Sequence, residues 1–300
     1  DSTFPRFISA ITGGDNDKNI ALITVIGYLI HAFRDPTKPS AILLTDEILS
    51  DNPHGGTGKG IFTKALQYFR IHQDYDGKSF SFDRNFLWQG ISFDTQIVVI
   101  DDIPKSFPFE RLFSVLTNGI QVENKNSKTF YIPFQDSPKF IISANSAIKG
   151  EGNSHERRKL EIEFSNFFHR DNTPKDYFGH QLFDDWNSEQ WVQFDNFMLT
   201  CMQVYFQKGL IYPKSINIEL KKLHANTSSE FIEWAEANIF PEMMISKREF
   251  YDRFIDACPN QKRFTSSVRF YSFVESYASF YKLNLKSTKL NGVHIFKFDK

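Results

Sequence analysis

A glycine-rich segment places the strongest constraint on the fold of this 300-residue chain. It runs from Pro53 to Gly60, after the apolar run Ala41–Leu44 and before a helical pattern over Phe62–Phe69. Glycines between a strand and a helix let backbone N–H groups converge on phosphate oxygens, and a lysine adds a positive charge. The segment therefore predicts a phosphate-binding loop made of Gly55, Gly56, Thr57, Gly58, Lys59 and Gly60. The competing interpretation is a glycine-rich turn with a solvated lysine.

A second apolar run ends in paired carboxylates. Ile97–Ile100 has the character of a buried strand, and Asp101 and Asp102 follow it directly. Beside a phosphate-binding loop, one carboxylate can hold Mg²⁺ while the other orients or deprotonates the attacking water. We assign the metal to Asp101 and the water to Asp102. Loop and strand together predict ATP and Mg²⁺ as cofactors.

The loop departs from the usual phosphate-binding pattern at two positions. Pro53 takes the first glycine position, and Gly60 stands where Ser or Thr would give Mg²⁺ a hydroxyl. Thr63, one helical turn later, is badly placed to substitute. Either the metal is held by Asp101, water and phosphates, or turnover is weak.

Two further motifs complete the pattern. The apolar run Phe140–Ala144 ends in Asn145, whose carboxamide would lie near the γ-phosphate; the alternative is a turn-forming Asn. Arg157 and Arg158 precede another strand pattern, Leu160–Phe164. In a ring ATPase an arginine here can reach the phosphates of the neighbouring subunit, whereas the alternative is a pair of solvated charges.

The alternation of short apolar runs with helical patterns predicts an α/β fold around a parallel sheet. We expect a helical leader over residues 1–38, a phosphate-loop core over 39–170, and a helical segment with a linker over 171–228. Residues 229–300 show three helical patterns and then apolar strands around Asn291-Gly292, a strong hairpin signal. Three helices followed by a hairpin predict a winged-helix domain.

Composition narrows the range of partners and compartments. Lys plus Arg total 35 against 36 for Asp plus Glu, so any nucleic-acid surface must be local. Cys201 and Cys258 lie far apart, which argues against a disulfide framework or a zinc site and fits a reducing compartment. The longest apolar stretch, Ile20–Phe33, is interrupted and shorter than the roughly 20 residues that span a bilayer. We expect a cytoplasmic protein with no membrane partner.

The order of these motifs resembles the superfamily 3 helicases, an AAA+-related class found in viruses, phages and plasmids. The segment between the second and third strands carries the resemblance furthest. It has a helix-ending pattern over Leu112–Ile120, two lysines at Lys125 and Lys128, and a strand ending in Ala144-Asn145. This is similar to that family's helix, basic β-hairpin and strand. Primase-helicase proteins of phages and mobile elements are the closest relatives that it suggests.

The resemblance implies a homohexameric, ATP-dependent DNA helicase or translocase in phage or mobile-element replication, located in the host cytoplasm. In the family, the basic hairpin enters the ring channel and follows single-stranded DNA, which implies DNA contacts by Lys125, Asn126 and Lys128. Lysines on a hairpin suit phosphate contact without sequence preference, although they also keep an exposed hairpin soluble. A primase domain or replication proteins are the further partners implied.

Two other functions stay open. The chain is alternatively an ATP-binding DNA-binding or initiator scaffold that hydrolyses weakly because of Gly60, or a packaging-type ATPase. The final domain either binds DNA through basic residues on its third helix and hairpin or docks a protein. Those basic residues are Lys262, Arg263, Arg269, Lys282, Lys286, Lys289 and Lys297.

Overall fold

The structure is a computed structural model that describes residues 2–38, 40–47, 56–126, 128–145, 153–213, 223–224, 226–290 and 292–299. Its contacts divide the chain into unit 1, Asp1–Ser215, and unit 2, Ile216–Lys300. Pro53 and Gly55 of the glycine-rich segment lie outside the described residues, as does Asn291 of the expected hairpin turn.

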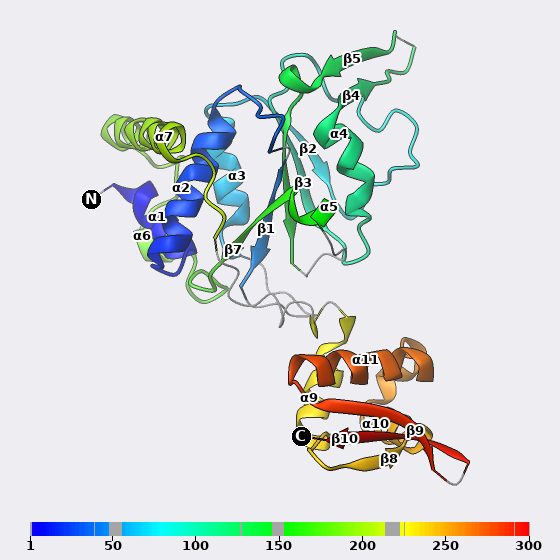
Figure 1. Ribbon diagram of the computed structural model, residues 1–300. Helices are drawn as coiled ribbons and strands as arrows, with labels where there is room; N and C mark the ends of the chain where they lie inside the picture. Colours follow the sequence, from blue (N-terminus) through cyan, green and yellow to red (C-terminus); the bar gives the residue numbers. More distant parts are fainter. Residues whose placement is uncertain are drawn as a thin grey trace. The chain divides into compact units, whose positions relative to one another are not determined.

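Unit 1 is built around a five-stranded sheet in the order β2-β3-β6-β1-β7, and every neighbouring pair is parallel (Figure 1). Its strands are β1 (Ala41–Asp46), β2 (His72–Asp76), β3 (Ile97–Ile103), β6 (Lys139–Ala144) and β7 (Lys159–Phe164). The expected α/β fold with a parallel sheet is therefore confirmed. Four of the five strands coincide with apolar runs that the sequence predicts.

Both faces of the sheet are covered, which explains why these strands read as continuous apolar runs. Ile42 and Leu44 of β1 join a core shared with helices on one face, while Ala41 and Leu43 join a second core on the other. The first core includes residues of α1 (Thr3–Ile11), α2 (Asn16–Ile30), α3 (Lys59–Gln67) and α7 (Ser188–Lys208). The second includes residues of η1 (Phe109–Leu112) and α4 (Phe113–Thr117).

The edge strand β2 is absent from the sequence prediction. Its residues, His-Gln-Asp-Tyr-Asp, contain no apolar run, and it pairs only with β3. A strand with one hydrogen-bonded neighbour at a sheet edge tolerates polar side chains. The hydrophobic pattern consequently gives no signal for it.

A separate two-stranded hairpin follows α4. Its strands, β4 (Gly119–Val122) and β5 (Phe130–Pro133), pair antiparallel and project from the body of unit 1 (Figure 1). The short helix η2 (Phe134–Asp136) returns the chain to β6. Two further short helices flank β7 in sequence, α5 (Asn153–Glu156) and α6 (Pro174–Phe178).

Unit 2 has its own apolar core and a three-stranded sheet in the order β8-β10-β9. Its described elements are α9 (Ser229–Asn238), β8 (Met244–Ser246), α10 (Lys247–Ala257), η3 (Pro259–Arg263), α11 (Ser267–Phe280), β9 (Asn284–Leu290) and β10 (Val293–Asp299). The three expected helices and the final antiparallel hairpin are present. The short strand β8 is an addition that the sequence does not predict.

No helix within the described ranges combines the length and apolar character needed to cross a membrane.

Two buried basic side chains join the end of α2 to the start of β6. Lys139, only 2% exposed, donates to the carbonyl oxygens of Tyr28 and His31. Arg34 donates to the Ser137 hydroxyl and the Pro138 carbonyl, both at 2.7 Å. Lys139 thereby satisfies carbonyl groups that the end of α2 leaves without partners, and Arg34 satisfies a carbonyl group of the loop before β6. Burial lowers the pKa of Lys139 to about 6, and the charges of Arg34 and Arg70 add to the effect.

This burial predicts that the stability of unit 1 increases between pH 7 and pH 9. In that window the unfolded chain keeps a proton on Lys139, whose ordinary pKa is 10.5, while the folded chain does not. Since the unfolded state binds more protons, the free energy of unfolding rises with pH, by up to about 1.4 kcal/mol per pH unit. Denaturant titrations at pH 7, 8 and 9 measure the slope. Lys139→Met is expected to remove it, and an equal slope in both proteins would contradict this assignment.

Candidate active site

A cavity of about 1000 Å³ lies where β1, β3 and β6 reach their carboxyl ends. This edge of an open parallel sheet is the usual position for ligands, and the volume suits a nucleotide. The cavity brings together most of the residues that the sequence singles out, namely Gly56, Thr57, Gly58, Lys59, Gly60, Asp101, Asp102 and Asn145. Gly55 lies outside the described residues.

The glycine-rich loop leads directly into α3. Gly58 precedes the helix with a φ of 104°, and a Cβ atom on it would lie 3.0 Å from the Phe7 ring, so glycine suits both conformation and space. The first hydrogen bond of the helix runs from Phe62 N to Gly58 O at 2.9 Å. The N–H groups of the first turn therefore have no intrahelical acceptor and are available to an anion in the cavity.

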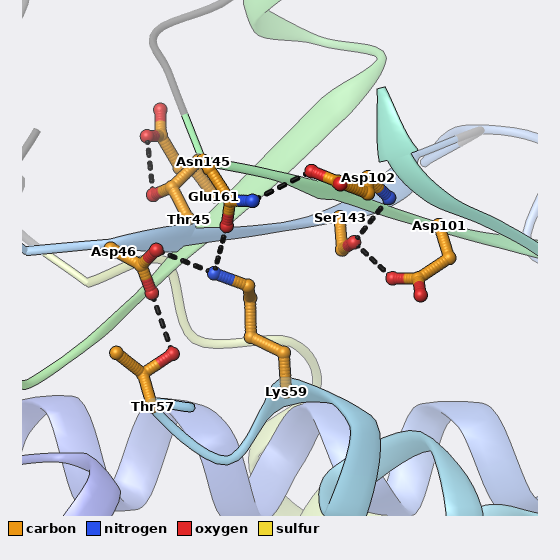
Figure 2. A network of polar contacts seen from close by, with 9 residues as sticks. All are labelled: Thr45, Asp46, Thr57, Lys59, Asp101, Asp102, Ser143, Asn145 and Glu161. Atoms are coloured by element: carbon orange, nitrogen blue, oxygen red, sulfur yellow. Dashed lines mark hydrogen bonds and ion pairs between the residues drawn. The ribbon is translucent and has the colours of Figure 1, made fainter. Parts of the chain in front are cut away.

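Lys59 is held between the ends of two strands (Figure 2). Its Nζ lies 2.6 Å from Asp46 Oδ2 at the end of β1 and donates to Asn145 Oδ1 at 2.8 Å. Asp46 also accepts a hydrogen bond of 2.6 Å from the Thr57 hydroxyl. The loop is thus fastened to β1 through one carboxylate, and the ammonium group is fixed in position before any ligand binds.

The two adjacent carboxylates are held in different ways (Figure 2). Asp102 Oδ1 accepts a hydrogen bond of 2.6 Å from Asn145 Nδ2, and its Oδ2 pairs with Lys78 Nζ at 2.5 Å. Ser143 Oγ donates to Asp101 Oδ1 and accepts from Asp102 N at 2.8 Å. Asp101 is exposed, and its Oδ2 has no hydrogen-bond partner among the described residues. Asp101 therefore offers a free carboxylate oxygen, whereas both oxygens of Asp102 are engaged.

The carboxylates of Asp101 and Asp102 fit Mg²⁺ as it is bound in nucleotide-dependent enzymes, where one or two carboxylates act as ligands together with phosphate oxygens and water. The described residues contain no group of three or more His, Cys, Asp or Glu that could hold a metal without such help. Gly60 supplies no hydroxyl. The Thr63 hydroxyl donates to the Gly60 carbonyl at 3.0 Å, so it is already used within the helix.

Arg157 and Arg158 lie at the opposite end of the strands from the cavity. Ala41 N donates to Arg158 O at 2.8 Å, and Ser40 Oγ donates to Arg157 O at 3.3 Å, which places both arginines beside the beginning of β1. Arg157 is exposed. Arg158 is half-buried, with its guanidinium 4.5 Å from the Phe113 ring centroid. Neither arginine lines the cavity of its own chain.

The three candidate DNA-contacting residues also lie outside the cavity. Lys125, Asn126 and Lys128 occupy the loop that joins β4 to β5, and all three are exposed. Asn126 has a φ of 60°, a conformation that asparagine tolerates in turns. Within the described residues no carboxylate pairs with either lysine, so both ammonium groups are available to a polyanion.

Several residues of the site escape the sequence analysis. Asp46 follows the apolar residues of β1 much as Asp101 follows Ile97–Ile100, and that position is a signal from which it could have been predicted. Ser143 lies inside a strand and is recognisable only once β3 and β6 are neighbours. Lys78 follows β2, a strand with no hydrophobic signal. The cavity is completed by Ile61 of α3 and by residues of the segment after β7, including His169 and Arg170.

No protein-family model and no curated protein sequence matches the chain. Solved structures do show similarity. Two A-form apo structures of the NrS-1 C-terminal region have TM-scores of 0.44 and identities of 15% and 14%, over 99% of this chain and 75% of theirs. A structure of JCV helicase with a bound acetamide compound has a TM-score of 0.39 and 13% identity, over 79% of this chain and 64% of its own.

Proposed function

We propose that this chain is the ATP-driven motor of a superfamily 3 type DNA helicase or translocase that acts in phage or mobile-element replication. One observation carries the assignment. Lys59, Asn145 and Asp102 form a continuous chain of contacts at 2.8 and 2.6 Å, which links the phosphate-binding loop to the paired carboxylates inside one cavity. A nucleoside triphosphate with Mg²⁺ is the ligand that uses all of these groups together.

Each residue then has a role set by its contacts. Lys59 and the N–H groups at the start of α3 bind the β- and γ-phosphates, and Asp101 holds Mg²⁺ through its free oxygen. Mg²⁺ supplies charge neutralisation on the phosphate oxygens. Asn145 contacts Lys59 and Asp102, so it relates the γ-phosphate to the carboxylate that orients water. Lys78 fixes the second oxygen of Asp102.

A ring of six copies accounts for the position of the arginines. Arg157 is exposed and lies beside the beginning of β1, at the end of the strands that faces away from its own cavity. It can therefore stabilise phosphate charge only on a neighbouring subunit. We assign this role to Arg157 before Arg158, because Arg158 packs on Phe113 and donates to Ser154 O at 3.1 Å.

Single-stranded DNA is the proposed track. Lys125 and Lys128 are exposed on the hairpin loop and pair with no carboxylate in the part of the chain that the structure describes. This arrangement gives phosphate contact independent of sequence. Unit 2 is proposed as a winged helix, with three helices and a terminal hairpin, that binds DNA or a replication protein.

Steady-state ATPase activity, with and without single-stranded DNA at low salt, tests the proposed function. Wild-type protein is expected to hydrolyse ATP with Mg²⁺ and to turn over faster when DNA is added. ATP binding without turnover, under conditions in which the chain assembles and with every nucleic acid tried, would refute the motor assignment.

The double substitution Lys125→Ala/Lys128→Ala is expected to remove DNA stimulation and leave DNA-independent turnover unchanged. Both lysines lie on the hairpin loop, outside the cavity. Loss of two phosphate contacts should also reduce the slope of log affinity against log salt by about 1.4 for a single strand. DNA-binding titrations at several salt concentrations measure the slope. Lys38→Ala, another exposed lysine of unit 1, is the matched control.

Gly60 specifically favours a second candidate function, a scaffold that binds ATP and hydrolyses it weakly. The position can be tested directly, because Gly60 is exposed and a Cβ atom there would meet nothing within 4 Å. Gly60→Ser is expected to lower the Mg²⁺ concentration for half-maximal turnover about tenfold, as about 1.4 kcal/mol of added binding would. Gly60→Ala fills the same space without a hydroxyl and should not. Equal metal dependence in all three proteins would contradict a metal-binding position at residue 60.

A further inference from the structure

Arg170 is a second cation in the candidate active site, and neither the motif pattern nor the assignments above use it. It lines the same cavity as Lys59, Asp101 and Asn145. The two cations differ in how they are held. The Lys59 ammonium is already bound to Asp46 and Asn145, whereas the exposed Arg170 guanidinium has no hydrogen bond or ion pair within the described residues. Arg170 is therefore the cation in this cavity with its donors available to a ligand.

The turn that carries Arg170 is well fixed. His169 N donates to Asn172 O at 3.2 Å, and Asn172 N donates back to His169 O at 3.1 Å. The Asn172 side chain closes the turn by donating to Phe167 O at 2.8 Å. Immediately afterwards, Thr173 and Asp176 form a capping box at the start of α6. Such a turn fixes the backbone that carries the arginine, so binding restricts the side chain of Arg170 but costs little backbone entropy.

The order of the strands places Arg170 at one end of the phosphate-binding loop. In the sheet, β1 lies between β6 and β7. Asp101 and Asn145 come from β3 and the end of β6, on one side of β1, while the turn with Arg170 follows β7 on the other side. If the γ-phosphate lies beside the carboxylates, the α- and β-phosphates extend toward β7.

We propose that Arg170 binds the α- and β-phosphates of the nucleotide held by its own chain. This inference rests on the proposed function and adds a ligand contact to it. A guanidinium group presents several N–H donors in a planar fork that matches phosphate oxygens. With Gly60 the chain offers Mg²⁺ one protein ligand fewer. A second cation beside Lys59 would neutralise part of the negative charge of the triphosphate that Lys59 alone does not neutralise.

Titrations with fluorescent analogues of ADP and ATP test the assignment. Arg170→Ala is expected to weaken both ligands by a similar factor of about 10 to 100, and Arg170→Lys should fall between alanine and wild type. Asn145→Ala, which removes a contact at the γ-phosphate, should weaken ATP more than ADP. Arg248→Ala removes an arginine whose side chain is 92% exposed in unit 2 and serves as the control. Thermal unfolding of each variant checks that the fold is retained.

The outcomes separate this inference from the function on which it rests. If Arg170→Ala binds both analogues within twofold of the wild-type affinities, the inference about Arg170 is wrong. It is also wrong if only the affinity for the ATP analogue falls, because that result would place Arg170 at the γ-phosphate. If the wild type binds neither analogue, the proposed function itself fails and this inference fails with it.

Discussion

Replacing Lys59 with alanine is expected to weaken ATP binding and to lower kcat/KM for ATP hydrolysis, each about 100-fold. Two effects act in the same direction. The substitution removes the cation that meets the phosphates, with a charged hydrogen bond worth about 1.5–3 kcal/mol. It also leaves Asp46, which is 6% exposed, with the Thr57 hydroxyl as its one remaining side-chain partner among the described residues. An uncompensated carboxylate at the loop repels the incoming phosphates.

A second variant separates these effects. Lys59→Ala should be less stable than wild type, because a buried carboxylate that loses its ion partner costs about 3–5 kcal/mol. Lys59→Ala/Asp46→Asn should recover most of that stability without recovering full ATP affinity. Isothermal titration and denaturant unfolding on the same preparations measure both quantities.

Lys64→Ala is the matched control for these measurements. Lys64 lies on the same helix, α3, but its side chain is 43% exposed and pairs with Asp184 at 3.0 Å, away from the cavity. We expect wild-type ATP affinity in this variant. ATP affinity within twofold of wild type in Lys59→Ala would contradict the position of the phosphates.

Gly27→Ala is expected to destabilise unit 1 by about 3 kcal/mol, at the upper end of the range for overpacked cores. Gly27 lies in α2 where this helix packs on α7. A Cβ atom at Gly27 would lie 2.2 Å from the Cys201 carbonyl oxygen and 2.6 Å from Tyr205 Cβ. The carbonyl belongs to the backbone of α7, so relief requires one helix to shift. That cost exceeds the gain in helix propensity, which is at most about 1 kcal/mol.

The same substitution at Gly60, a helical glycine with open space around it, is expected to increase stability rather than to decrease it. Gly60→Ala introduces a Cβ atom with nothing within 4 Å, so it should raise stability by up to about 1 kcal/mol. Denaturant unfolding of both variants, with ATP absent, compares them directly. Equal stability of Gly27→Ala and wild type would mean that α2 and α7 do not pack this closely.

The strands of the sheet that are buried on both faces could be predicted from the sequence, because such burial requires a nearly continuous run of apolar residues. Ala41–Leu44 and Ile97–Ile100 are apolar throughout, and Phe140–Ala144 is apolar except for Ser143, because their apolar side chains alternate between two cores. The edge strand β2 contains no apolar run and therefore gives no such signal. The buried basic residues Arg34 and Lys139 could not be predicted from the hydrophobic pattern either, since their burial depends on carbonyl groups that only the folded chain brings near them.

The candidate site divides in the same way. Lys59 begins α3, Asp101 lies in the second half of β3 and Asn145 directly follows β6, at positions that a linear motif records. Asp46 and Arg170 enter the site through strand neighbours instead, because β1 carries one carboxylate to the loop and the chain after β7 returns to the cavity. Asp46 follows an apolar run closely, which is a signal that a single sequence carries, whereas predicting Arg170 requires the strand order, which a single sequence does not determine.

ATP-dependent strand displacement from a forked DNA duplex tests the central claim most directly. Wild-type protein with ATP and Mg²⁺ is predicted to release the labelled strand, while Lys59→Ala and Lys125→Ala/Lys128→Ala release none above the rate without ATP. If the wild type hydrolyses ATP in the presence of DNA and forms its assembly, yet releases no strand from forks of either polarity, the chain is not a helicase motor.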